Sequence, residues 1–200
     1  MRKWLITGLA LALVVLIGSR FFPLVEEITV HGNRQYTAAQ IAELAGVAHG
    51  DPLLWVTVQS ASRLFDEPWI HSAVITRVWP HTVQINVHEE VPVLTDGVNA
   101  WSESGTLLPG GPMHNWAALP ILAGWGAPRV TEALKLYQLL RPFTVERIAY
   151  SPAGFDITLA GRTLFTPSVD ALEQQWGAFV STNAGRVAVY PWGVSFTDEQ

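Results

Sequence analysis

Histidine, serine and carboxylate side chains are the groups in this 200-residue chain that could carry out catalysis or bind a metal ion. The chain has no cysteine, which excludes thiolate metal sites and disulfides. The histidines form no HExxH sequence, in which two imidazoles one helical turn apart bind zinc. His81 and His88 differ by seven positions along a predicted strand, so they should point to opposite faces. We therefore predict no metal and no cofactor. The histidines are His31, His49, His71, His81, His88 and His114.

The hydroxyl and carboxylate candidates lack the partners that catalysis requires. Ser104 lies in Glu-Ser-Gly, without the Gly-x-Ser-x-Gly turn that exposes a nucleophilic serine. Glu89 and Glu90 are adjacent in a predicted strand and should point to opposite faces, whereas the two acids of a glycosidase face each other across a cleft. The glycine-rich stretch 109–112 has no lysine to bind phosphate. The sequence therefore predicts a protein that is not an enzyme.

The composition indicates a folded chain and disfavours nucleic acid as a partner. Hydrophobic residues make up 49% of the chain and charged residues 14%, which is the reverse of the balance in disordered chains. Of the 12 basic residues, Arg2, Lys3 and Arg20 flank the first apolar run, so 9 basic residues face all 17 acidic ones in the rest of the chain. Such a surface repels phosphate backbones.

The first segment has the pattern of a membrane anchor. Residues 4–19 contain no charge over 16 positions, and extension to Phe22 gives 19 residues if Arg20 reaches toward the lipid headgroups. A cleaved signal peptide shares the basic start and apolar middle, but the small residues of a cleavage site are missing here. We therefore predict a transmembrane helix at 4–22, a cytoplasmic stub at 1–3, and all later residues outside the cytoplasmic membrane.

Residues 24–90 predict a small α+β unit. A short strand ends at the turn 31–33, and Thr37 with Gln40 forms a capping box that begins a helix. A second helix is expected from about Thr57. The alternating runs 73–79 and 82–89 then form a hairpin, whose apolar face carries Val83, Ile85 and Val87. Both helices should cover one face of the three-stranded sheet.

From Pro92 onward, frequent turn signals separate short apolar stretches, as in a meandering antiparallel sheet. Helices are expected at 131–140 and after the capping residue Ser168. The last run, 186–197, reads as one strand interrupted by Pro191 and should lie at a sheet edge, because proline cannot donate to a ladder. The remaining expected strands are 146–150, 155–160 and 163–166.

Tryptophan is abundant, with nine residues. Trp69, Trp79 and Trp176 fall on apolar faces and are expected in the core. Trp192, between a proline and a glycine, is expected to be exposed.

Two stretches carry a family resemblance. Residues 22–33 read Phe-Pro-Leu-Val-Glu-Glu-Ile-Thr-Val-His-Gly-Asn. Residues 68–92 read Pro-Trp-Ile-His-Ser-Ala-Val-Ile-Thr-Arg-Val-Trp-Pro-His-Thr-Val-Gln-Ile-Asn-Val-His-Glu-Glu-Val-Pro. Together with the apolar start, this pattern resembles the FtsQ/DivIB cell-division proteins. The resemblance implies an α+β chain with a transmembrane helix, a POTRA domain (β-α-α-β-β) at 23–92, and a mostly antiparallel β-domain with helices at 93–200.

The same resemblance implies a function. Such proteins are non-catalytic, bitopic scaffolds of the divisome at the division septum, and they bind FtsB/DivIC and FtsL. In the family a partner adds a β-strand to an exposed edge near the end of the chain, beside the last helix. The family stretch R-Y-x-x-G aligns with residues 189–193, although valine replaces the arginine and Ala188 replaces the preceding aspartate. The implied partner-binding residues are Tyr190, Trp192, Gly193, Val194, Val189 and Trp176.

Two other readings remain. One is a POTRA-containing module of outer-membrane assembly or secretion, for which the roughly 110 residues after the module are few. A mature N-terminus near Arg20 would favour a secreted module over an anchored scaffold. The other is an exported cell-wall hydrolase, which would need one of the nucleophile or metal signatures that are missing above.

Overall fold

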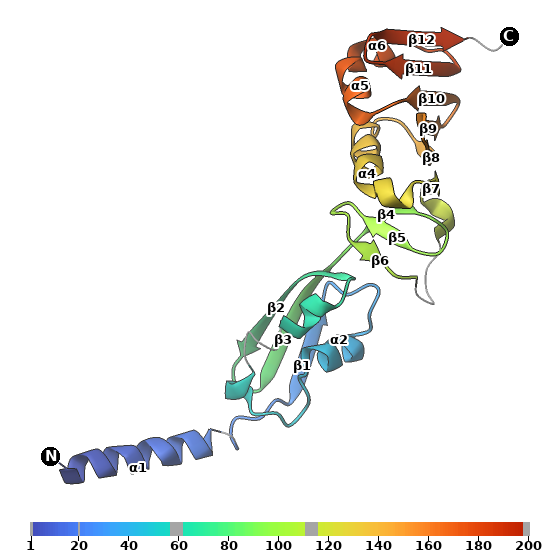
Figure 1. Cartoon of the computed structure of the whole chain (residues 1–200). Coiled ribbons are helices and arrows are strands. Elements are labelled where there is room, and N and C mark those ends of the chain that lie inside the picture. The colour runs from blue at the N-terminus through green and yellow to red at the C-terminus, as the bar shows by residue number, and fades with distance from the viewer. Residues whose placement is uncertain (1, 20, 57–61, 111–115, 198–200) are drawn as a thin grey trace. The chain divides into compact units, whose positions relative to one another are not determined.

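The computed structural model describes residues 2–19, 21–56, 62–110 and 116–197, and the chain divides into two compact units (Figure 1). Residues 1–90 form the N-terminal unit and residues 91–200 the C-terminal unit. The fold is mixed α+β, with one three-stranded sheet and one nine-stranded sheet.

The apolar start of the chain is helical. Helix α1 (Arg2–Gly18) covers most of the predicted anchor. Within the described ranges no helix is both long enough and apolar enough to span a bilayer, and the transmembrane helix expected over 4–22 is not found.

The N-terminal unit contains the small sheet. Its strands lie in the order β1-β3-β2, with β1 parallel and β2 antiparallel to the central β3. The expected hairpin is confirmed, and so is the apolar face of β3, where Val83, Ile85 and Val87 are buried. The elements are β1 (Glu27–His31), α2 (Ala38–Ala45), η1 (Leu53–Trp55), η2 (Arg63–Asp66), β2 (Ile70–Val78) and β3 (Thr82–Glu89).

Of the two helices predicted in this unit, the first is confirmed and the second is described only in part. Helix α2 begins with the capping box of Thr37 and Gln40, as predicted. The predicted start of the second helix, near Thr57, falls within residues 57–61, which lie outside the described residues. The described part that follows is the short 3-10 helix η2.

A polar loop fastens β1 to β3. The Glu89 carboxylate is buried and accepts hydrogen bonds from the backbone N–H groups of Arg34 and Gln35 (2.8 and 2.7 Å) and of Tyr36 (3.2 Å). Successive amides of this kind form a concave site for an anion. The loop approaches closely because Gly32 has φ +86° and its missing Cβ would lie 2.0 Å from the Val87 carbonyl oxygen. We call this arrangement the polar clamp.

The C-terminal unit contains the large sheet, whose strand order is β12-β11-β10-β9-β8-β7-β4-β5-β6. Most neighbours are antiparallel, as predicted, but β4–β7, β7–β8 and β10–β11 are parallel. Its strands are β4 (Pro92–Thr95), β5 (Ala100–Ser102), β6 (Leu107–Leu108), β7 (Ile121–Gly124), β8 (Val145–Ser151), β9 (Gly154–Leu159), β10 (Arg162–Thr166), β11 (Arg186–Tyr190) and β12 (Gly193–Thr197). Short 3-10 helices are η3 (Trp116–Ala118) and η4 (Ala127–Arg129).

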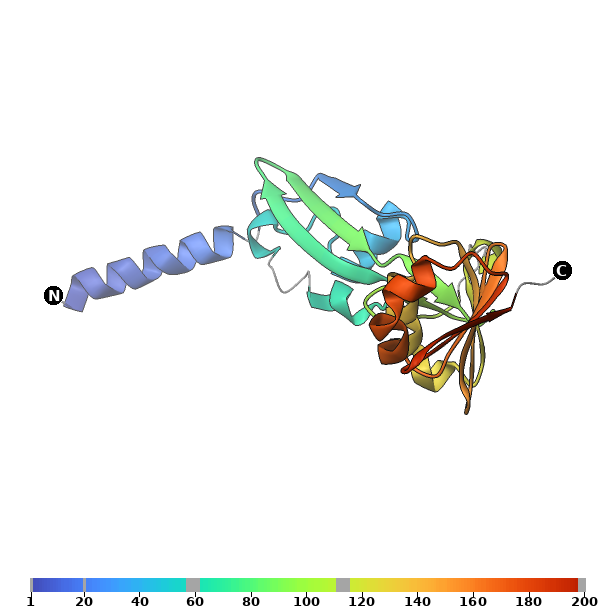
Figure 2. The ribbon, with the colours of Figure 1, turned by 90° about the horizontal axis from the view of Figure 1, so that it is seen from above.

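Three helices cover one face of this sheet, as Figure 2 shows for the part that contains β7 to β12. They are α4 (Val130–Leu139), α5 (Val169–Gln174) and α6 (Trp176–Val180). Ser168 caps α5 as predicted, with its hydroxyl accepting from the backbone N–H of Ala171. The largest fully buried side chain on these helices is Phe179. The core therefore lies between the helices and the sheet.

Two expectations about single elements are wrong. The run 186–197 is two strands, and Pro191 with Trp192 forms the turn between them, so Pro191 removes no ladder donor. The edge strand is β12, while β11 lies between β10 and β12. Trp79 is 62% exposed and not in the core, whereas Trp69 is buried and Trp192 is exposed as expected.

Candidate functional site

The outer strand β12 leaves one side of the large sheet open. It pairs with β11 in register Val189 with Val194 and Tyr190 with Gly193, and no other strand among the described residues pairs with it. An edge strand presents unpaired N–H and C=O groups in a row. The end of the chain that the family resemblance singled out thus contains a strand edge on which another chain could pair.

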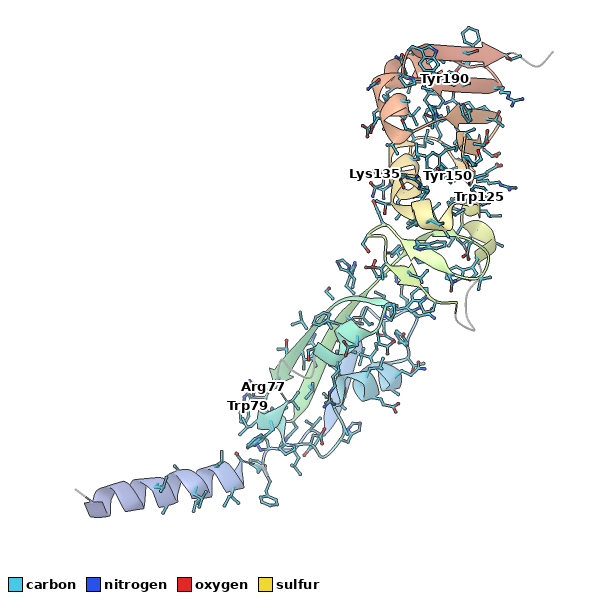
Figure 3. The ribbon with its side chains drawn as sticks, viewed as in Figure 1. Arg77, Trp79, Trp125, Lys135, Tyr150 and Tyr190 are labelled. Atoms are coloured by element: carbon cyan, nitrogen blue, oxygen red, sulfur yellow. The ribbon has the colours of Figure 1, made fainter. Side chains whose placement is uncertain are left out.

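Aromatic rings line the sheet face opposite the helices beside this edge. The ring of Tyr190 lies 5.8 Å from that of Phe165 on β10 and 5.1 Å from that of Trp192, with the latter pair nearly parallel at 10°. Trp192 is 81% exposed, whereas Phe165 and Tyr190 are half-buried. Figure 3 marks Tyr190 on the terminal hairpin. We call Phe165, Tyr190 and Trp192 the aromatic stack.

A hydrogen bond and a glycine conformation characterise the turn that carries Trp192. Gln175, between α5 and α6, donates from Nε2 to the carbonyl oxygen of Pro191 at 3.1 Å. Gly193 has φ +155°, which side-chain-bearing residues rarely adopt. The hydrogen bond and the glycine conformation together define the turn on which Trp192 lies.

The opposite, helix-covered face belongs to the core. Val189 is fully buried and Val194 is half-buried against the core cluster. The half-buried ring of Trp176 on α6 packs edge-on against Phe143 at 6.2 Å and lies 5.6 Å from Phe179. Side chains on this face therefore secure α6 and the terminal hairpin.

Arg162 completes the support beneath α6. Its guanidinium lies 4.4 Å from the ring centre of Phe143 and 4.5 Å from that of Phe179, and Nη1 donates to the carbonyl oxygen of Thr182 at 2.8 Å. Burial lowers the pKa of this guanidinium from its ordinary value, because the low-dielectric surroundings disfavour its charge. The cation nevertheless gains from the faces of two rings.

The predicted site residues thus divide between two faces of one hairpin. The structure brings Tyr190 and Trp192 together on the open face and places Val189, Val194 and Trp176 on the helix side. Sequence reasoning missed Phe165, which lies in the apolar pair Leu164-Phe165, and Phe196 on β12, which is 60% exposed. Adjacent large apolar residues in one strand indicate two occupied faces, and this signal could have identified Phe165.

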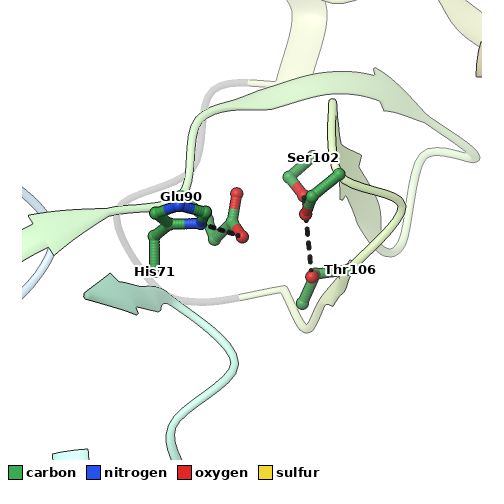
Figure 4. A network of polar contacts seen from close by, with 5 residues as sticks. His71, Glu90, Ser102 and Thr106 are labelled. Carbon is green, nitrogen blue, oxygen red and sulfur yellow. Dashed lines mark hydrogen bonds and ion pairs between the residues drawn. The ribbon is translucent and has the colours of Figure 1, made fainter. Parts of the chain in front are cut away.

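Figure 4 shows polar contacts around residues that the sequence analysis examined for catalysis. Within the N-terminal unit, His71 Nδ1 lies 3.0 Å from a carboxylate oxygen of Glu90. Within the C-terminal unit, Ser104 shares hydrogen bonds with the hydroxyls of Ser102 (2.7 Å) and Thr106 (3.0 Å) in the turn between β5 and β6. Over the described ranges, which leave out His114, no three histidine or acidic side chains group as a metal site would require.

Comparison with known proteins identifies the class of the N-terminal unit. Residues 24–90 match the POTRA domain, FtsQ-type. Residues 24–90 therefore form a POTRA domain, and the three-stranded sheet with α2 is its fold.

Curated relatives of the chain carry the same family name. The chain is 37% identical over 102 residues to the cell division protein FtsQ of Streptomyces coelicolor, which covers 47% of this chain and 38% of the relative. It is 35% identical over 68 residues to FtsQ of Geobacter sp., covering 34% and 25%. A weaker match, 24% identical to FtsQ of Nitrosospira multiformis, covers 98% of this chain and 89% of the relative. The chain spans less than two fifths of the length of the first two relatives. The chain is thus similar to FtsQ cell division proteins, through the domain match over residues 24–90 and through relatives that carry this name.

Proposed function

We propose that this protein is a non-catalytic scaffold of the cell-division machinery and that it binds a partner along the outer edge of β12. The observation that carries the proposal is the unpaired edge of β12 beside the aromatic stack. A partner segment in extended conformation would pair with the main chain of β12 and continue the sheet.

The surroundings of the edge would give the added strand its specificity. Alternate side chains of a strand point to opposite faces, so the partner would contact both sides of the sheet. On the open face it meets the aromatic stack, and on the helix side it meets the exposed parts of Phe196 and Val180 (60% and 46% exposed). Large aromatic side chains commonly carry much of the binding energy of an interface.

The proposed partners are the FtsB/DivIC-like and FtsL-like division proteins of the same cell. Curated relatives are named cell division proteins, which supports a partner within the divisome. Acidic residues outnumber basic ones by 17 to 12, which argues against nucleic acid as the partner.

We further propose that residues 4–22 attach the protein to the cytoplasmic membrane at the septum, with a single crossing and with residues 23–200 outside. The support is the uncharged run 4–19 behind Arg2 and Lys3, since basic residues remain on the cytoplasmic side. Six apolar side chains of α1 are more than half exposed, which is costly in water and favourable in lipid. They are Leu9, Leu11, Leu13, Val14, Leu16 and Ile17.

The test is the affinity of the detergent-solubilised full chain for the extracytoplasmic parts of the FtsB-like and FtsL-like proteins. Tyr190→Ala with Trp192→Ala should weaken binding at least tenfold, because it removes most of the aromatic stack. Trp125→Ala is the matched control, since Trp125 is 68% exposed in the same unit but lies beyond β7. Binding that survives the double substitution would move the site elsewhere, and no binding to either partner would reject these partners.

Two single proline substitutions distinguish main-chain pairing with the partner from side-chain contact with it. Along an antiparallel strand, successive residues direct their N–H groups alternately toward the neighbour and away from it. Of Ser195→Pro and Phe196→Pro, one should therefore disturb the pairing with β11, and the other should leave the hairpin folded while abolishing partner binding. Phe196→Ala controls for the lost ring. A partner that binds both proline variants at full affinity would rule out strand addition.

A further inference from the structure

The POTRA domain exposes a second aromatic surface, far in sequence from the terminal hairpin. It consists of Leu54 and Trp55 on η1 with Trp79 directly after β2, which are 39%, 45% and 62% exposed. We call these three residues the tryptophan patch. Burial of such large apolar side chains would be favourable, yet the POTRA domain leaves a large part of each one in contact with solvent.

A hydrogen bond and a shared groove connect the part of the tryptophan patch on η1 with the part that follows β2. Arg77 donates from Nη1 to the carbonyl oxygen of Leu54 at 3.1 Å, which holds η1 against the end of β2. A shallow groove of about 450 Å³ runs between them and is lined by Leu53, Leu54, Ile75, Thr76, Arg77 and Trp79. Figure 3 shows Arg77 and Trp79 at the end of β2. The patch is therefore a built surface of the domain and not a set of isolated side chains.

The tryptophan patch is tied to the chain where it leaves the apolar segment. The indole Nε1 of Trp55 donates to the hydroxyl of Ser19 at 3.3 Å. The backbone N–H of Leu53 donates to the carbonyl oxygen of Pro23 at 2.9 Å. Phe22, which is 69% exposed, lies edge-on to the His81 ring at 6.1 Å. Aromatic side chains thus continue from the end of the apolar run into the POTRA domain.

We propose that the tryptophan patch, with Phe21 and Phe22, docks the POTRA domain onto the lipid headgroup region of the membrane. This inference rests on the proposed attachment through residues 4–22. Tryptophan favours the membrane–water interface because its ring is apolar and its N–H remains polar, and arginine beside it can reach phosphate groups. Acidic residues outnumber basic ones in 24–90, so binding depends on the aromatic rings and does not require anionic lipid.

The test uses the full chain reconstituted into phosphatidylcholine vesicles, with part of the lipid brominated near the headgroup end of its chains to quench nearby indole fluorescence. Four single variants are compared, Trp55→Phe, Trp79→Phe, Trp125→Phe and Trp192→Phe. Trp125 and Trp192 are similarly exposed (68% and 81%) but lie in the C-terminal unit, so they are the matched controls. Phenylalanine keeps each site apolar, and circular dichroism verifies the fold.

The two groups of variants should change the quenched fraction in opposite directions. Loss of a lipid-facing indole lowers the fraction of fluorescence that bromine quenches, whereas loss of a water-facing indole raises it. With nine tryptophans, each substitution removes about one ninth of the indole fluorescence, so the quenched fraction changes by less than that. A lower fraction for Trp55→Phe and Trp79→Phe and a higher one for the controls supports docking. A higher fraction for all four, in chains that float with the vesicles, overturns docking alone. A chain that does not float with vesicles overturns both docking and the attachment through 4–22.

Discussion

The two units of this protein hold their strands together by different means. In the C-terminal unit, large apolar side chains from three helices cover a nine-stranded sheet, and the polar side-chain contacts are mostly local ones in turns. In the POTRA domain the apolar core is smaller, and the polar clamp reaches across more than 50 positions of sequence from Glu89 to the loop after β1. A small domain buries less of its surface, so specific polar contacts make up a larger share of its stability.

The exposed tryptophans of the two units give a second contrast. Trp79 and Trp192 are both more than 60% exposed, but Trp79 lies near the end of the apolar segment and Trp192 lies beside an unpaired strand edge. The same residue type therefore supports a lipid-facing proposal in one unit and a protein-facing proposal in the other. The neighbouring structural elements therefore indicate whether an exposed aromatic ring is proposed to contact lipid or protein.

The largest effect is expected in the core of the C-terminal unit. Phe179→Ala should lower the free energy of unfolding of this unit by about 4 kcal/mol, because it opens a cavity and removes one ring beneath Arg162. Amide hydrogen exchange reports each unit separately. Phe196→Ala, at a ring 60% exposed, should cost less than about 1 kcal/mol. Similar losses of protection in the two variants would show that the apolar core is not what holds this unit.

A second substitution tests the close approach in the POTRA domain. Gly32→Ala should destabilise this domain by about 3 kcal/mol, since the new Cβ would collide with the Val87 carbonyl and φ is positive. Gly50→Ala is the matched control, because φ is +88° there but no atom lies within 4 Å, so only about 1 kcal/mol is expected. Equal unfolding midpoints of the two variants in urea would contradict a role for the close approach.

The polar clamp itself is tested at Glu89. Glu89→Ala should cost about 2 kcal/mol, because three backbone N–H groups lose a charged acceptor. Exchange of the amides of 34–36 should accelerate most. Glu43→Ala, at an exposed position of α2, should stay within about 0.5 kcal/mol of the parent. If the exchange rates of these three amides do not change, the hydrogen bonds to Glu89 do not stabilise this loop.

The smallest effect is a pH dependence confined to the POTRA domain. Burial, then a hydrogen bond to Glu67 at 3.1 Å and the charges of Glu67 and Glu89, raise the pKa of Tyr36 to about 12. The raised pKa stabilises the folded state below pH 10, and this stability is lost as the pH rises toward 12, because the unfolded chain releases the proton first. Partial exposure limits the effect to about 1 kcal/mol.

The ultraviolet absorbance of tyrosinate measures this ionisation. Tyr36→Phe should remove the step near pH 12, and Tyr190→Phe, in the other unit, should leave it in place. A titration of Tyr36→Phe that still contains the late step would assign it to another of the four tyrosines.

Much of the secondary structure followed from local patterns. The capping box of Thr37 and Gln40 specified the start of α2, because both bonds are made within one turn. The alternation of Val83, Ile85 and Val87 specified the buried face of β3. The Gly-Asn turn and the Pro-Trp stretch led to the family because those residues stand close together in sequence.

Non-local pairing could not be inferred in the same way. The parallel pairs β4–β7 and β10–β11 join strands separated by long connections, and no local signal distinguishes them from a meander. The role of Glu89 depends on amides more than 50 positions away. A local pattern specifies the conformation of a segment but not which distant segment it meets.

For this protein, the sequence by itself determined the start of α2, the start of α5, the β2–β3 hairpin and the POTRA pattern, since each depends on neighbours within a few residues. Only the tertiary structure decided that Pro191 turns a hairpin, that β12 is the outer strand, and that Trp79 faces solvent while Val189 is buried. Exposure and edge position depend on what packs against a strand on both sides, and those contacts come from segments far along the chain.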